Sequence, residues 1–115
     1  MLTLDALRAY GANVDEGLAR CMNNEPFYLK IVGMVQVDGN FEKLKSAMET
    51  GDTKAAFEAA HALKGASGNV SLTPIYTPVC ALSDTLKGRT DQPIPAGCQE
   101  LAAETLKQYE RLKAL

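Results

Sequence analysis

The stretch from Gly51 to Val70, GDTKAAFEAAHALKGASGNV, decides the fold. Its Gly-Asp start favours a tight turn with Asp52 as the N-cap of a helix, and most of the residues that follow are strong helix formers. We therefore expect a helix from Thr53 to about Val70. On a helical wheel, the arc that faces the core holds small or apolar residues, namely Ala56, Ala60, Leu63, Ser67 and Val70.

His61 is the only histidine of the chain and falls on the other side of this helix, with Lys64 and Gly68, and with Phe57 and Gly65 nearby. The imidazole is therefore expected to point to solvent from the middle of a rigid helix. Each glycine in a helix interior costs about 1 kcal/mol relative to alanine, a cost that is tolerated where another molecule must approach the backbone closely. Two glycines beside an exposed imidazole thus favour a landing area for another protein.

Two residues beside His61 each have two interpretations. Lys64 lies on the adjacent turn and could offset the charge of a group attached to the imidazole, or it is an ordinary solvated lysine. Phe57 could add an apolar contact at the edge of the landing area, or it packs against a neighbouring helix. A lone histidine on a helix is most often a surface residue without a function. Here only the neighbouring residues favour a functional role for His61.

Two short helices are expected at the N-terminus. Thr3 is a candidate N-cap for the first, which Gly11 ends, and Asn13 with Glu16 resembles a capping box for the second, which runs through Met22.

A third helical segment begins at Asn24, with Pro26 in its first turn. Asp38-Gly39-Asn40 either breaks or kinks it. Its expected core stripe consists of Phe27, Ile31, Met34 and Val35, continued by Phe41, Leu44 and Met48 up to Thr50.

The C-terminal part holds two more helices separated by the longest loop, Lys87 to Pro95. Thr73-Pro74 marks the start of the first, as cap and first-turn proline, and its apolar seam consists of Leu72, Ile75, Val79, Leu82 and Leu86. The last helix is expected from about Ala96 to the end, with one side formed by Cys98, Leu101, Thr105, Tyr109 and Leu112.

These patterns predict an all-α fold, an antiparallel up-down four-helix bundle with short additional N-terminal helices. We expect a single domain over 1–115, with the core bundle at about 24–115 and a helical cap at about 3–22. A self-contained bundle favours a monomer.

The composition agrees with a small globular domain. Of the 115 residues 46% are apolar and 23% charged, and the formal net charge is -2 without a basic cluster, which argues against a nucleic-acid binder. No apolar run is long enough for a membrane span or a signal peptide, so a cytoplasmic location is expected. Cys21, Cys80 and Cys98 are widely spaced and, with one histidine, complete no usual zinc site; we expect reduced thiols and no metal.

Other chemistry that uses a histidine lacks its partners here. A nucleophilic triad needs a Ser or Cys and an orienting carboxylate, but the nearest carboxylate in sequence is Glu58 and no Gly-x-Ser-x-Gly elbow occurs. There is no P-loop and no kinase motif. The chain is therefore not expected to be an enzyme, and any phosphoryl group must come from another protein.

The segment from Phe57 to Val70 resembles the signature of histidine phosphotransfer (HPt) domains, commonly written A-H-x-L-K-G and present here as Ala60 to Gly65. The resemblance covers most of Asn24 to Lys87, with one departure at Ser71, where many members carry glycine.

This resemblance implies that His61 carries a phosphoryl group on the ring nitrogen farther from the backbone. It implies that Lys64 helps to neutralise that group and that Gly65 lets the partner approach. The helical wheel adds Phe57 and Gly68 as expected partner-binding residues. The implied partners are response-regulator receiver domains, whose aspartate and bound Mg²⁺ supply most of the catalytic apparatus, and a hybrid histidine kinase. No cofactor is expected on this chain.

Two other functions remain open. A non-phosphorylated helical interaction module would bind a receiver or kinase domain with the same surface. A general helical scaffold would show a further exposed apolar stripe, which the wheel does not reveal. A metalloenzyme comes last, for lack of ligands.

Overall fold

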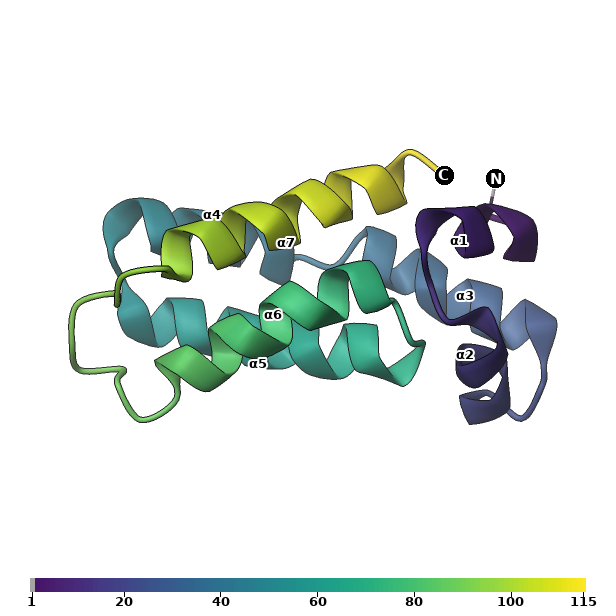
Figure 1. The fold of residues 1–115 in the computed structure, drawn as a ribbon, viewed down its shortest axis with the longest axis horizontal. Coiled ribbons are helices and arrows are strands. Elements are labelled where there is room, and N and C mark those ends of the chain that lie inside the picture. The colour runs from purple at the N-terminus through teal and green to yellow at the C-terminus, as the bar shows by residue number, and fades with distance from the viewer. Residues whose placement is uncertain (1) are drawn as a thin grey trace.

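The computed structural model describes residues 2–115, which form helices and no strands. The all-α prediction is therefore confirmed (Figure 1). The helices are α1 (Leu4–Tyr10), α2 (Val14–Arg20), α3 (Glu25–Gln36), α4 (Asn40–Thr50), α5 (Thr53–Asn69), α6 (Thr73–Leu86) and α7 (Cys98–Lys113).

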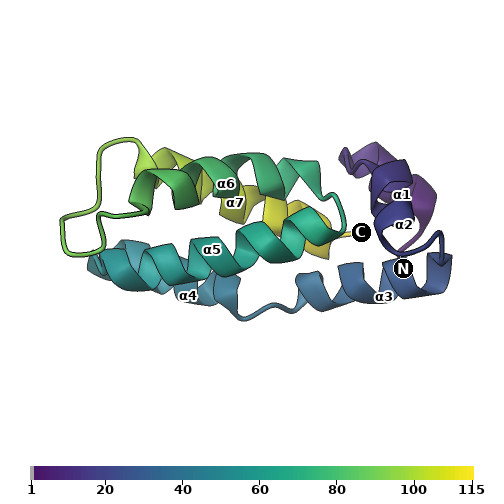
Figure 2. The same ribbon diagram turned by 90° about the horizontal axis from the view of Figure 1, so that it is seen from below.

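Helices α4 to α7 form the four-helix bundle. Helix α5 packs between α4 and α6, α6 also packs against α7, and α7 contacts α4 and closes the bundle. Successive helices run in opposite directions, which confirms the up-down arrangement (Figures 1 and 2). Helix α3 continues the line of α4 beyond one end of the bundle, where α1 and α2 also lie, and the 87–97 loop lies at the other end (Figure 2).

Local capping chemistry sets most helix starts as predicted. Four capping side chains each accept a hydrogen bond from the backbone N–H three residues further on: Thr3, Asn13, Asn24 and Asp52. Gly51 adopts the left-handed conformation (φ 74°) that the tight turn before Asp52 needs. At α6 the prediction was one residue off, because Leu72 is the N-cap and Thr73 is the first helical residue.

Two helix ends decide how the N-terminal half is divided. The Asp38-Gly39-Asn40 segment breaks the helix, and the Asp38 carboxylate accepts hydrogen bonds from the backbone and side-chain N–H groups of Asn40 at 2.8 and 3.0 Å. Helix α2 ends at Arg20, earlier than the predicted Met22. The reason is that Met22 and Asn23 have φ values of 55° and 56°, in the left-handed region that a right-handed helix cannot use.

The bundle core is where the helical patterns placed it. The five predicted α6 seam residues are fully buried, and so are the five predicted core residues of α5. On α7 the predicted side faces inward, with Cys98, Thr105 and Leu112 buried, and the Tyr109 ring stacks on Phe41 at 3.7 Å between centroids. Burial of this apolar surface, at about 25 cal/mol per Å², is the main favourable term for folding.

The predicted core stripe of α3 is wrong for Phe27 and Met34, which are exposed. The observed buried stripe consists of Tyr28, Val32 and Val35, of which Val35 was predicted. The two stripes differ by about one residue and fit the helical period equally well. The inward stripe is fixed by Tyr28, whose ring lies against Gly17 and whose hydroxyl donates to the backbone carbonyl of Val70 at 3.1 Å.

Two hydrogen bonds join the N-terminal segment to the end of the bundle. The Tyr10 hydroxyl donates to the carbonyl of Gln108 at 2.8 Å, and the backbone N–H of Asn13 donates to the carbonyl of Ser71 at 3.0 Å. Burial raises the pKa of Tyr28 to about 12, so its hydroxyl stays protonated as a donor.

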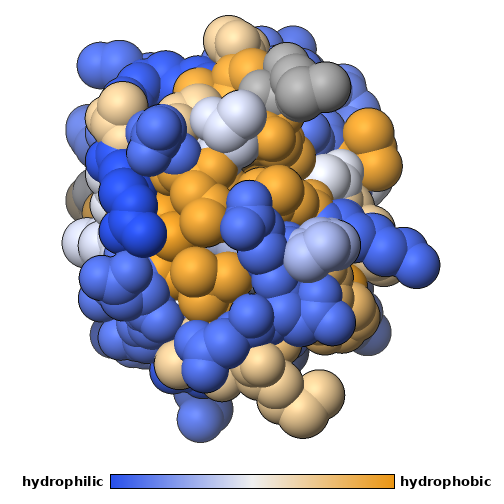
Figure 3. Space-filling model, turned by 90° about the vertical axis from the view of Figure 1, so that its right-hand side faces the viewer, coloured by the Kyte–Doolittle hydropathy of each residue, from blue (hydrophilic) through white to orange (hydrophobic). Residues whose placement is uncertain are grey.

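Viewed towards the end of the molecule where α1 and α2 lie, apolar side chains gather in the middle of the face within a hydrophilic rim (Figure 3).

Among the described residues, no helix combines the length and the hydropathy that crossing a bilayer requires.

Substitution of Gly17 by alanine is expected to destabilise the folded protein. A Cβ there would lie 2.5 Å from Tyr28 Cε1 and 2.8 Å from the Val70 carbonyl oxygen, so the backbone of α2 must shift. Gly17→Ala should therefore lower the free energy of unfolding by about 1–3 kcal/mol, as measured by urea denaturation.

Gly33→Ala is the matched control, because Gly33 also lies within a helix and its Cβ would meet only Leu2 Cδ1 at 4.0 Å. It should raise the free energy of unfolding by up to about 1 kcal/mol. Equal effects of the two substitutions would contradict the close packing of α2 against α3.

Candidate functional site

Helix α5 has two different faces. Its buried face consists of small side chains and Leu63, and its buried hydroxyl, that of Ser67, is satisfied by donation to the carbonyl of Leu63 at 2.7 Å. Close packing of α4 and α6 on this face fixes the rotation of the helix. The opposite face therefore lies in solvent, as predicted.

His61 lies near the middle of the exposed face. Its ring is flanked by that of Phe57, with the centroids 5.6 Å apart and the planes inclined by 25°. Phe57 is half-buried and packs against the core, so its ring is held in place beside the imidazole. Among residues 2–115, no side chain or backbone group is hydrogen-bonded to the His61 ring, and the residue is exposed.

Two ion pairs between helices lie on either side of this face. Towards α6, Lys64 Nζ lies 3.2 Å from Asp84 Oδ1. Towards α4, Lys43 Nζ lies 4.0 Å from Glu58 Oε1. His61 thus lies on an exposed strip of α5 that is bordered by charged pairs.

Lys64 is held from helix α6. The Asp84 carboxylate, through its hydrogen bond and its charge, raises the pKa of Lys64, so the ammonium remains charged at neutral pH. Asp84 also accepts a hydrogen bond from the thiol of Cys80 at 3.8 Å, and a hydrogen bond with Cys80 raises the pKa of Tyr76. Lys64 is therefore a charged residue that forms an ion pair across α5 and α6.

The two glycines of the exposed face have different surroundings. A Cβ on Gly65 would meet nothing within 4 Å, so there is open space beside His61. A Cβ on Gly68 would lie 3.0 Å from the ring of Tyr76. Gly68 therefore gives room to Tyr76 of α6, whereas Gly65 leaves the backbone of α5 accessible from outside.

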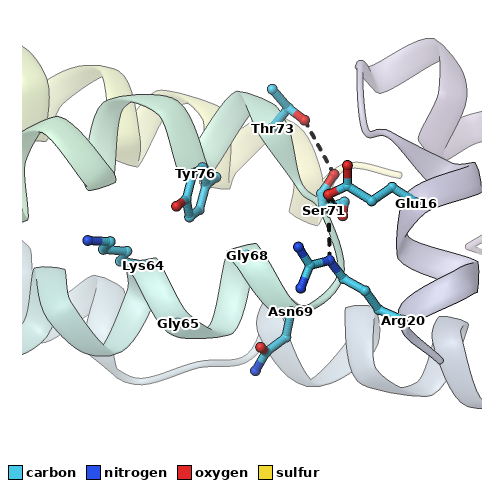
Figure 4. Close-up of a pocket in the computed structure, with 9 residues that line it drawn as sticks. All are labelled: Glu16, Arg20, Lys64, Gly65, Gly68, Asn69, Ser71, Thr73 and Tyr76. Atoms are coloured by element: carbon cyan, nitrogen blue, oxygen red, sulfur yellow. Dashed lines mark hydrogen bonds and ion pairs between the residues drawn. The ribbon is translucent and has the colours of Figure 1, made fainter.

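A hollow of about 350 Å³ adjoins this face and also involves the N-terminal helices. It is lined by α5 from Lys64 to Asn69, by the start of α6, and by Glu16 and Arg20 of α2 (Figure 4). Figure 4 shows the Arg20 side chain reaching from α2 towards the end of α5. The surface beside His61 is thus built from three helices.

Ser71 joins α2 to the end of α5. Its φ of 54° lies in the left-handed region, a conformation that favours glycine. Its hydroxyl donates to Glu16 Oε1 at 2.7 Å, and Glu16 also pairs with Arg20 at 3.5 Å. The serine therefore holds the carboxylate that orients Arg20.

The structure places all five predicted site residues on the outer side of α5, and Gly68 among them lies against the ring of Tyr76. Sequence reasoning missed Asp84, Tyr76, Glu16 and Arg20, which come from other helices. Polar residues on the outer face of α6 were a signal for Asp84, but its partner depends on how α6 is aligned with α5.

The described residues contain no group of three or more His, Cys, Asp or Glu side chains placed to hold a metal ion. Cys21 and Cys98 are buried, Cys80 is partly buried, and all three are free thiols.

A family model described as the Hpt domain matches residues 34–115. Curated protein sequences and solved structures gave no significant match. The matched residues contain α4 to α7 entirely, whereas α1, α2 and most of α3 lie outside them. Because the match covers more than half of the chain, the protein belongs to the Hpt domain family, whose members are histidine phosphocarriers of two-component signalling.

Proposed function

We propose that this protein is a phosphorelay carrier that accepts a phosphoryl group on His61 from the aspartate of one receiver domain and passes it to another receiver. The observation that carries the proposal is the exposed His61 ring in the middle of α5, next to the open space at Gly65. Membership of the Hpt family supports the same conclusion.

In this reaction the imidazole nitrogen farther from the backbone attacks the phosphorus of an aspartyl phosphate. A nitrogen–phosphorus bond forms, the bond between phosphorus and the carboxyl oxygen breaks, and the aspartate leaves as a carboxylate. Histidine suits this role because a neutral imidazole is available near pH 7. Transfer depends mainly on alignment and charge neutralisation, which a rigid helix and the Lys64 ammonium would provide.

The receiver would supply the remaining parts. We expect its aspartate to be the phosphoryl donor or acceptor and its bound Mg²⁺ to neutralise charge, with no cofactor on this chain. A hybrid histidine kinase would load the first receiver, since the chain has no nucleotide-binding motif. We propose that the carrier works as a cytoplasmic monomer.

His61→Gln tests the site of phosphorylation directly. A receiver domain labelled with radioactive phosphate should label the wild-type protein and leave His61→Gln unlabelled, because glutamine has no nucleophilic ring nitrogen. Circular dichroism should show an unchanged fold, since His61 is exposed. If the receiver binds both proteins equally and labels neither, the protein is a phosphate-independent interaction module and the proposal fails.

Substitution of Gly65 should block approach without harming the fold. A side chain at this position enters open space, and alanine or leucine favours the helix over glycine. The transfer rate should fall progressively from wild type to Gly65→Ala to Gly65→Leu, by about tenfold or more for leucine, with thermal stability equal or higher. Normal transfer by folded Gly65→Leu together with a large loss of stability would refute this role.

Because Asp84 pairs with the Lys64 ammonium, it is expected to weaken the neutralisation of the phosphoryl charge by Lys64. Asp84→Asn removes the charge that holds the ammonium, so the phosphohistidine lifetime should increase by about two- to threefold, as fits a surface ion pair of 0.2–1 kcal/mol. Lys64→Ala should shorten the lifetime or slow transfer mildly.

The double variant Lys64→Ala/Asp84→Asn tests whether Asp84 acts through Lys64. If it does, Asp84→Asn has no effect in the Lys64→Ala background. An unchanged lifetime in both single variants would make Lys64 an ordinary surface residue.

A further inference from the structure

A second hollow adjoins the one beside Lys64 and Gly65. It measures about 390 Å³ and lies between α2, α3 and the end of α5. Arg20 and Asn69 line both hollows, so the second hollow lies directly beside the first, on the side of α3. The remaining lining residues are Cys21, Phe27, Ile31 and Val70.

The α3 wall of this second hollow is apolar and accessible. Phe27 is 44% exposed, and Ile31 is partly buried. Aromatic residues such as Phe27 are enriched in contacts between proteins. The rotation of α3 that buries Tyr28 is what leaves Phe27 facing outward.

The second hollow lies close enough to His61 for one partner of ordinary size to cover both. A standard interface covers about 800 Å² on each partner, the area of a disc about 16 Å in radius. Asn69 follows His61 by eight residues in α5, about 12 Å along the axis at 1.5 Å per residue. A globular partner centred on His61 therefore reaches Asn69 and the hollow that it borders.

We propose that the receiver domain that docks on His61 also covers this second hollow and places an apolar side chain of its own against Phe27 and Ile31. The inference rests on the proposed function and adds a second contact area to it. Its apolar wall, Phe27 and Ile31, belongs to α3 and precedes the residues that match the family. It therefore adds affinity for receivers with a matching apolar side chain and distinguishes them from receivers without one.

The test compares Phe27→Ser with Met34→Ser. Both residues are exposed apolar residues of α3, and Met34 is the more exposed at 58%, but only Phe27 lines the hollow. The probe is a purified receiver domain, phosphorylated with acetyl phosphate, that labels the wild-type protein. Phe27→Ser should raise the half-saturating receiver concentration by about five- to tenfold and change the maximal labelling rate by less than about twofold, because the substitution affects binding and not the chemical step. Met34→Ser should behave as wild type in both.

Other results would overturn the inference. If Phe27→Ser behaves like Met34→Ser while the receiver labels wild type normally, the second contact does not exist and the proposed function stands. If sedimentation shows that wild type self-associates through Phe27 and the half-saturating concentration is unaffected, the hollow binds a second copy of the chain instead. If no receiver labels the wild type, the proposed function itself fails and the inference fails with it.

Discussion

The close packing of the buried face of α5 is the constraint on which the site depends. Ala56, Ala59 and Ala60 have no exposed surface, and their small side chains allow α4 and α6 to approach closely. A helix held in this way cannot rotate without burying polar groups or exposing Leu63. His61 is therefore held outward by the core, and its own contacts contribute little to its orientation.

Most of the bundle could be predicted because its signals are local. The caps at Asn24 and Asp52 and the seam of α6 depend on residues a few positions apart, where helical geometry is nearly fixed. The α3 stripe could not be predicted in this way, because two stripes fit the same period. Tyr28 decides between them by packing on Gly17 and bonding to Val70, residues distant in sequence.

The site shows the same division between local and long-range information. The outward position of His61 follows from the pattern of α5 alone and was predictable. The two glycines seemed equivalent in sequence, yet Tyr76 covers Gly68 and nothing covers Gly65. The pairing of Lys64 with Asp84 depends on how the antiparallel helices α5 and α6 are aligned. The packing of their buried faces determines this alignment, and no local sequence pattern indicates it.

The 87–97 loop closes the bundle at the end away from the N-terminal helices, where Thr53 Oγ1 donates a hydrogen bond to the carbonyl of Gln92 at 2.6 Å (Figure 2). Lengthening a loop adds closure entropy only slowly, and chain emerging between Lys87 and Arg89, before this anchor, points away from α2 and α3. A fluorescent reporter or an extra domain inserted there would therefore leave both hollows unobstructed. This loop is thus a suitable site at which to fuse another domain to the protein.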